Sequence, residues 1–266
     1  MKRFLRAASI AACVGLSTNW AGAQTLQGQS LPTQTLKADT TQAFQHDPAM
    51  SLVTGSGKGY DDDKNWAEGI CFPLANTPAY ANSQVYHPGG TAVRSNPNQC
   101  DAANYSYPWQ DNFCESRDWT NGLCRAGQGH QGQDIRPSTC KANMYWAVAA
   151  EDGVITQVGS YTVAITGNAS PHRIFRYLHM QSSSLKVKLG DHVVRGQKLG
   201  LVSNNLGTSN GKPQYTTIHL HFEIRVAQSE TTPEGQTLAV HAFVPPYLAL
   251  LDAYQRKLGG DCKVAE

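Results

Sequence analysis

The chain has 266 residues, a length that accommodates one domain of ordinary size with extensions, or two small domains. It contains 22 basic and 20 acidic residues, and three of the basic ones lie in the first 23 positions, so the remainder carries 19 basic against 20 acidic residues. Bulk charge cannot hold such a nearly neutral protein on nucleic acid or another polyanion, which argues against partners of that class.

The N-terminus has the features of a secretory signal. Three basic residues in the first six positions precede a short apolar run, and Ala21-Gly22-Ala23 is a small-residue cleavage site before Gln24. The run is too short to span a bilayer, and acylation at Cys13 is the weaker alternative. We therefore assign residues 1–23 to a signal peptide and expect a periplasmic or extracellular protein.

Six cysteines remain after the signal, which in an oxidising compartment predicts up to three disulfides among 15 connectivities. The absence of any C-x-x-C spacing argues against a zinc finger. We expect the last cysteine to tie the C-terminal tail to the body of the protein. The six are Cys71, Cys100, Cys114, Cys124, Cys140 and Cys262.

The first part of the mature chain divides by composition. Residues 24–65 are polar and without periodicity, as is typical of a flexible lead-in. Residues 66–125 contain four cysteines and three tryptophans among many Asn, Pro and Gly residues, which predicts a loop-dominated extension held by disulfides. We expect the tryptophans to pack under long loops, the alternative being a surface on which glycans stack.

A histidine and an aspartate, His130 and Asp134, lie four residues apart in a glycine-rich stretch. In an extended segment they share a face, and Gly132 between them would leave room for an ion. Imidazole and carboxylate are zinc ligands. We expect a Cys124–Cys140 disulfide to hold this stretch still.

Short runs rich in β-branched and aromatic residues follow, separated by Gly, Asn and Asp. They predict a mainly β domain over residues 126–244, a compact antiparallel sandwich or half-barrel. The runs are Tyr145–Ala149, Val154–Val158, Tyr161–Thr166, Arg173–Leu178, Leu185–Leu189, Val193–Val194 and Leu199–Val202.

The stretch from Thr217 to Val226 alternates polar and apolar side chains, which predicts a strand with one buried face. Its apolar residues, Leu220, Phe222, Ile224 and Val226, would point into the core. Its polar residues, His219, His221, Glu223 and Arg225, would share the opposite face, the alternative being an edge strand that is polar on its wet side. Two histidines two residues apart can serve one metal site.

The last segment, residues 245–266, predicts a packing helix and a tail. Pro245-Pro246 would begin the helix, and Gly259-Gly260 would end it. The apolar residues between them follow helical spacing in a single stripe. They are Tyr247, Leu251, Tyr254 and Leu258.

Four motifs occur in order: His130-x3-Asp134, a Tyr-x-His-Met motif whose histidine is His179, a Gly190–Gly200 turn pattern, and His219-x-His221. Together they resemble the M23 zinc metallopeptidases, the lysostaphin- and LytM-type peptidoglycan endopeptidases. The resemblance covers about residues 126–228. It implies an M23-like fold, peptide bonds of peptidoglycan as substrate, and one bound Zn²⁺.

By position, the resemblance implies that His130, Asp134 and His221 hold the zinc ion and that His179 and His219 are catalytic. Three protein ligands leave a fourth position for water, as a catalytic site requires. We favour His219 as the base and His179 as the partner of the oxyanion, although the roles are exchangeable. Glu223 is a rival base, and we prefer for it a role in orienting a ligand imidazole or pairing with Arg225.

Three other interpretations are weaker. A non-catalytic M23-like domain could bind or activate another wall hydrolase, but such relatives lose ligands that this chain retains. A carbohydrate- or lipoyl-like binding module leaves the histidines unexplained. A latent enzyme, with its N-terminal region covering the metal, is a further alternative. The five remaining histidines, His46, His87, His172, His192 and His241, are expected to be surface or capping residues.

Overall fold

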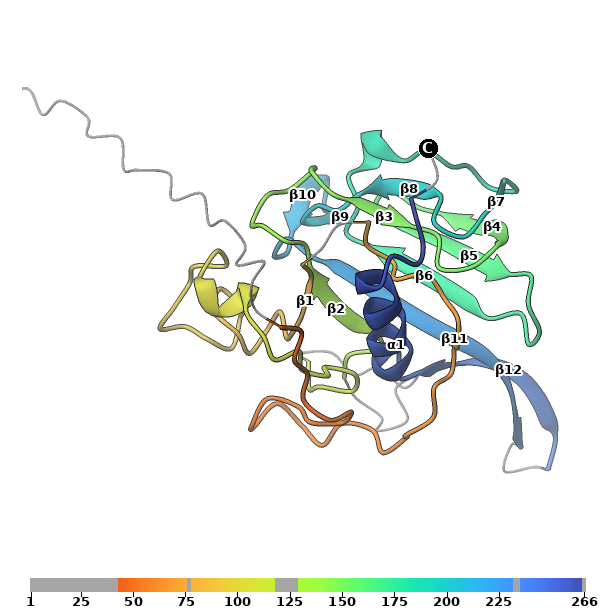
Figure 1. The fold of residues 1–266 in the computed structure, drawn as a ribbon, viewed down its shortest axis with the longest axis horizontal. Helices are drawn as coiled ribbons and strands as arrows, with labels where there is room; N and C mark the ends of the chain where they lie inside the picture. The colour runs from red at the N-terminus through yellow and green to blue at the C-terminus, as the bar shows by residue number, and fades with distance from the viewer. Residues whose placement is uncertain (1–42, 76–77, 118–128, 232–234, 265–266) are drawn as a thin grey trace, which may run out of the picture. The chain divides into compact units, whose positions relative to one another are not determined.

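The computed structural model describes residues 43–75, 78–117, 129–231 and 235–264 (Figure 1). The expected signal peptide, much of the lead-in, Trp119 and Cys124 lie outside these residues. Within them the predicted fold class is confirmed: the strands pair only in antiparallel fashion, and one α-helix, α1 (Tyr247–Leu258), follows the last strand. All of the described residues belong to one compact unit.

The main sheet has eight strands in the order β1-β2-β11-β6-β5-β4-β7, with β12 also paired to β11. Strand β11 lies between β2 and β6 and then continues with β12 into a hairpin that extends past its neighbours (Figure 1). In sheet order the strands are Tyr80–Ala81, Gln133–Arg136, Leu220–Thr231, Ile174–Leu178, Val163–Gly167, Gly153–Val158 and His192–Val193, and β12 is Thr237–Val244.

Two smaller sheets complete the β structure of the described residues: β3 (Trp146–Val148) pairs with β8 (Lys198–Leu201), and β9 (Asn205–Ser209) pairs with β10 (Lys212–Tyr215). The strand predicted at Leu185–Leu189 is wrong. Val187 is buried there, but only one backbone hydrogen bond, from Lys186 N to Leu199 O (2.8 Å), joins this run to β8. Val187 therefore packs without strand pairing, and Leu189, the last apolar residue of the run, is exposed.

The hydrophobic core extends from the sheet into the loop-rich segment and α1. Trp109 is fully buried, its ring centroid lies 4.5 Å from that of Tyr254, and its Nε1–H donates to Ala79 O. The expected packing role of the tryptophans is confirmed at this residue. Tyr247 of α1 donates its hydroxyl to Trp109 O, so the helix and the loops share one core.

The C-terminal helix follows the prediction closely. Tyr247, Leu251 and Tyr254 of the predicted stripe are buried, whereas Leu258, in the last turn, is exposed. A disulfide between Cys71 and Cys262 ties the tail to the body, as expected. None of the helices in the described part of the chain combines the length and apolarity that crossing a bilayer requires.

The disulfide expected between Cys124 and Cys140 is wrong, because Cys140 is bonded to Cys100. That bond joins the loop-rich segment to the chain shortly after β2. Cys114 is disulfide-bonded as well. The N-terminal segment is thus cross-linked to the chain four residues after the strand that carries Asp134.

The polar side of β11 does not face solvent. His219, His221 and Glu223 are at most 5% exposed, as fully buried as the apolar residues between them. The loop-rich segment covers this face, and Phe113 packs there against Phe243 of β12. A segment without periodicity thus provides the cover of this face, so the alternative of an edge strand with a wet polar side is wrong.

Candidate metal centre

Strand pairing brings the predicted site residues together. In the register of the main sheet, His221 of β11 lies opposite Asp134 of β2 on one side and Leu178 of β6 on the other. Consequently His179, one residue after β6, and His219, just before β11, flank the same point. His130 reaches it from the loop before β2, so all five predicted residues line one cleft.

Three donor atoms converge at the centre of this cluster. His130 Nε2 lies 2.7 Å from His221 Nδ1, and Asp134 Oδ1 lies 3.1 Å from each of these nitrogens. Ligand atoms at about 2.0–2.1 Å from one tetrahedral zinc ion lie about 3.3 Å apart. Two imidazoles and one carboxylate at this spacing fit a zinc ion.

Hydrogen bonds on the far side of each ring orient the two imidazoles. His130 Nδ1 lies 2.9 Å from Asn112 O, and a carbonyl oxygen only accepts, so the ring carries its hydrogen there and turns an unprotonated Nε2 inward. His221 Nε2 similarly donates to Glu223 Oε1 at 3.1 Å. Such partners fix the tautomer and orientation of metal-binding histidines.

The two imidazoles differ in proton affinity. Burial lowers the pKa of His130 to about 4, so this ring is neutral near pH 7. Burial opposes protonation of His221 too, but its hydrogen bonds to Asp134 and Glu223 outweigh that effect and raise its pKa. Without metal, the extra proton on His221 Nδ1 therefore lies among the three donor atoms, in the place that a cation would take.

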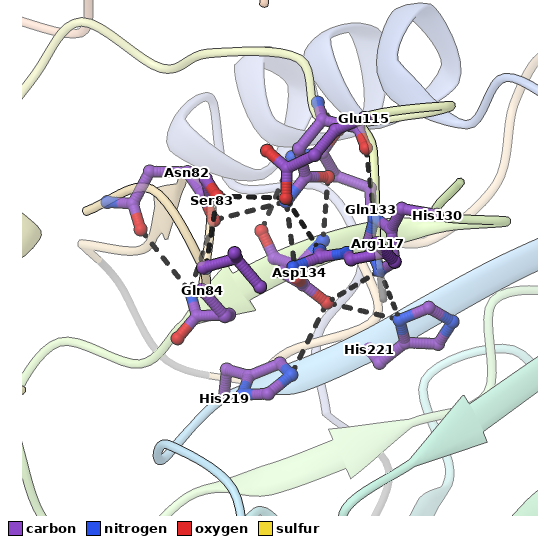
Figure 2. A network of polar contacts seen from close by, with 12 residues as sticks. Asn82, Ser83, Gln84, Glu115, Arg117, His130, Gln133, Asp134, His219 and His221 are labelled. Carbon is purple, nitrogen blue, oxygen red and sulfur yellow. Dashed lines mark hydrogen bonds and ion pairs between the residues drawn. The ribbon is translucent and has the colours of Figure 1, made fainter. Parts of the chain in front are cut away.

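Asp134 is almost fully buried, and its two oxygens have separate partners (Figure 2). Oδ2 accepts from Arg117 Nη2 at 3.0 Å and from Asn112 Nδ2 at 3.2 Å, which leaves Oδ1 for the histidines. Burial would raise its pKa, but His130 and His219 hold the pKa well below the usual range. The carboxylate is thus ionised and fixed in orientation.

His179 and His219 lie side by side at the cluster, with ring centroids 4.5 Å apart. Each donates its Nδ1–H to a carbonyl oxygen at 2.9 Å, that of Asn205 for His179 and that of Thr217 for His219. Burial lowers the pKa of both rings. Both are therefore neutral near pH 7. The Nε2 of His179 carries no hydrogen, whereas the Nε2 of His219 lies 3.3 Å from Asp134 Oδ1, which competes with Thr217 O for the one hydrogen of that ring.

His179 also has a backbone φ of +68°, unusual for a residue with a side chain. Such a conformation costs about 1–3 kcal/mol and is concentrated at functional sites. The ring of Tyr161 stacks on the His179 imidazole with an interplanar angle of 4°. The strained backbone and the stacked ring together hold this histidine at the cleft.

Glu223 has no oxygen left for proton transfer. Its Oε1 accepts from His221 and from Arg176 (3.0 Å), and its Oε2 accepts from Arg225 (2.9 Å). Burial would raise its pKa, but these partners lower the pKa to about 2. Both the orienting contact and the Arg225 pair that the sequence analysis favoured are present.

Gly132 does not leave room for an ion, contrary to expectation. A Cβ at this position would lie 2.5 Å from Phe222 O and 2.8 Å from His221 Nε2. The missing side chain instead allows β11 and the His221 ring to approach the loop before β2. The five other histidines lie outside the cluster, and none lines the cleft.

The cleft has a volume of about 490 Å³ and two walls of different origin. One wall comes from the β9–β10 hairpin and the residues after it. The other wall, which the sequence analysis missed, comes from the loop-rich segment. Its lining residues are Gln84, Val85, Gly89, Gly90, Thr91, Pro97, Gln99 and Arg117.

Comparison with known proteins assigns part of the chain. Residues 128–233 match the model of peptidase family M23. No curated protein matches the chain.

Solved structures with similar folds include a proposed glycyl-glycine endopeptidase lytM from Ruminococcus gnavus, at 19% identity and a TM-score of 0.41, over 70% of this chain and 60% of that one. The catalytic domain of lysostaphin from Staphylococcus simulans matches at 19% identity and a TM-score of 0.37, over 56% of this chain and 94% of that domain. A zinc-containing peptidase from Vibrio cholerae matches at 22% identity and a TM-score of 0.31, over 53% of this chain and 38% of that one. Similarity at this level extends no activity to this chain.

Proposed function

We propose that the protein is an exported zinc metalloendopeptidase that hydrolyses peptide bonds in peptidoglycan stems or cross-bridges. The match of residues 128–233 to the model of peptidase family M23 supports this proposal. The observation that carries the proposal is the convergence of His130, Asp134 and His221 on one point, beside two further histidines that line the same cleft. A purely structural zinc site would have four protein ligands and no such neighbours.

In this proposal His130 Nε2, Asp134 Oδ1 and His221 Nδ1 hold the zinc ion. Zinc bound there would lower the pKa of a coordinated water towards about 7. The two remaining histidines, His179 and His219, line the same cleft, and Nδ1 of each lies 2.9 Å from a carbonyl oxygen. The chain itself therefore supplies the metal ligands and the groups that move protons.

We assign His219 as the general base. Its Nε2 lies nearest the ligand set, and its Nδ1–H is held by Thr217 O, so a proton taken at Nε2 can pass to the leaving amine. His179 is held in the same tautomer by Asn205 O, so it donates to an oxyanion only when its Nε2 is protonated. As a neutral ring it accepts a hydrogen bond and orients the water.

Peptidoglycan as the substrate class and export as the location rest on the family match, the disulfides and the N-terminal signal pattern together. Disulfides form and persist mainly in oxidising compartments. The cleft is lined by amides, hydroxyls and apolar groups around the ligand cluster, which suits a peptide backbone. In the same scheme residues 66–125 are an extension that forms one wall, and residues 245–266 are a packing helix and tail.

The alternative is a non-catalytic M23-like domain that binds or activates another wall hydrolase. The observation in its favour is the low exposure of the site, since each of the four clustered histidines is at most 7% exposed. All five positions of the site are nevertheless occupied by residues able to perform the chemistry, which favours an enzyme.

Zinc analysis and chelation test the proposal. We expect one zinc ion per purified mature protein, loss of muropeptide cleavage on treatment with a chelator, and recovery on adding zinc. Cleavage that is indifferent to chelation would contradict the metal-dependent mechanism. Stoichiometric zinc with no cleavage of any wall preparation would instead support the binding alternative.

A further inference from the structure

Asn112, which lies outside the family-matched region, contacts two of the three proposed metal ligands. Its carbonyl oxygen accepts from His130 Nδ1 at 2.9 Å, and its side-chain Nδ2 donates to Asp134 Oδ2 at 3.2 Å. Its Oδ1 accepts from the backbone N–H of Asp134, also at 3.2 Å. The residue is fully buried, so these contacts do not compete with solvent.

The chain after Asn112 runs alongside the ligand loop. Cys114 N donates to His130 O at 2.7 Å, and His130 N donates to Glu115 O at 2.8 Å. Arg117 then reaches Asp134 Oδ2 and pairs with Glu115 at 2.8 Å (Figure 2). Residues 112–117 thus support both the backbone and the side chain of two ligands, His130 and Asp134.

The scaffold behind Asn112 is also built from the loop-rich segment. Asn112 Nδ2 has a second acceptor in Asn82 O, and the backbone N–H of Asn112 donates to Gln133 Oε1. Asn82 is in turn bound to Arg136 and to Asn104 O. Each polar atom of Asn112 is therefore committed either to a ligand or to a fixed neighbour.

We propose that Asn112 is a positioning residue of the metal centre and that the loop-rich segment is a constituent of the site, not only its cover. The inference rests on the proposed zinc-binding function. The carboxamide fixes the rotation of the Asp134 carboxylate so that Oδ1 points at the two imidazole nitrogens. Without it, Asp134 must adopt that orientation during binding, which weakens metal affinity. Removing such a partner typically lowers affinity about 10–100-fold.

The test is zinc affinity of the full mature chain, measured by competition with a chromophoric chelator at neutral pH, together with the visible spectrum of the cobalt-substituted protein. For Asn112→Ala we expect a 10–100-fold rise in the zinc Kd and a changed cobalt spectrum. The matched control is Asn104→Ala. Asn104 is a buried asparagine of the same segment whose Nδ2 donates only to the carbonyls of Pro88 and Gln99.

The control should lower the melting temperature while leaving zinc affinity and the cobalt spectrum unchanged. If Asn112→Ala does not accumulate as folded protein, Asn112→Ser replaces it. The single oxygen of serine, on a shorter side chain, cannot take the places of both Oδ1 and Nδ2 of Asn112, so the same loss is expected. Wild-type affinity in the Asn112 variant, or an equal loss in both variants, would overturn the inference. No zinc binding by the wild type would instead contradict the proposed function itself.

Discussion

Replacing Glu223 by glutamine should separate its structural role from catalysis. Glu223 is fully buried between His221, Arg176 and Arg225, and its carboxylate is the shared partner of all three. Glutamine keeps the shape and an acceptor oxygen for His221 but removes the charge, much as protonation would. We therefore expect the variant to be less stable. It should still bind zinc, with a lower affinity than the wild type, and should retain measurable turnover.

The magnitude follows from the pKa of Glu223, which lies at about 2 in place of its ordinary 4.5. That difference corresponds to about 3 kcal/mol of folding free energy at neutral pH. Because the pKa is lowered in the folded state, the contribution is present above pH 4.5 and is lost as the pH falls towards 2. The same relation leaves about 1 kcal/mol at pH 3.

Urea unfolding of the metal-free protein in the presence of a chelator measures this effect at both pH values. Glu151→Gln is the matched control, since Glu151 also pairs with an arginine, Arg173, at 3.3 Å, but does so near the surface and away from the site. We expect the control to cost less than about 1 kcal/mol at either pH. A Glu223 variant as stable as the wild type at pH 7, or a loss that does not shrink at pH 3, would refute the reasoning.

Four further predictions concern the site and its support. His219→Ala should lose nearly all turnover while retaining stoichiometric zinc, whereas Glu223→Gln should keep measurable turnover. An activity assay in which Glu223→Gln is inactive and His219→Ala is active would instead make Glu223 the general base. Zinc affinity should continue to rise with pH beyond pH 6.5, because the metal displaces the proton on His221, whose pKa is raised. Zinc titrations at several pH values measure this dependence, and an affinity that does not change with pH would refute it. Gly132→Ala should cost about 1–3 kcal/mol and weaken zinc binding, since the new methyl group meets Phe222 O and His221; unchanged zinc affinity would count against the close approach. Removing the Cys71–Cys262 disulfide should lower unfolding free energy by about 2–5 kcal/mol and leave zinc content unchanged, as denaturation and metal analysis would show.

The site could be predicted from sequence wherever its residues lie in short motifs. His130-x3-Asp134 and His219-x-His221 each follow extended-chain spacing, and antiparallel pairing of β2 with β11 then brings Asp134 opposite His221. That pairing is a long-range contact, which periodicity does not show. The ordered set of motifs indicated it only through resemblance to a family.

The surroundings of the site could not be predicted from sequence patterns. The polar face of β11 alternates as a solvent-facing strand does, yet the segment that buries it has almost no regular structure in its described residues. Asn112 lies in that segment without periodicity or motif, and its role depends on contacts 18 and 22 residues away along the chain. Polar residues that cluster near cysteines, such as Asn112, Glu115 and Arg117, were the only available signal.

The N-terminal segment also bears on the latent-enzyme alternative. Trimming the chain before Asn112 would remove β1 and the buried Phe72, Leu74 and Trp109, all of which belong to the main core. The latent-enzyme hypothesis predicts a rise in activity on such trimming. The contacts of this segment predict a loss of folded protein instead.

Mass spectrometry of the products from defined muropeptides, incubated with the zinc-loaded protein, tests the central claim most directly. The account predicts hydrolysis of one peptide bond, a gain of one water in the summed product masses, and no product with a chelator or with His219→Ala. Intact muropeptides with a protein that binds zinc stoichiometrically would contradict it.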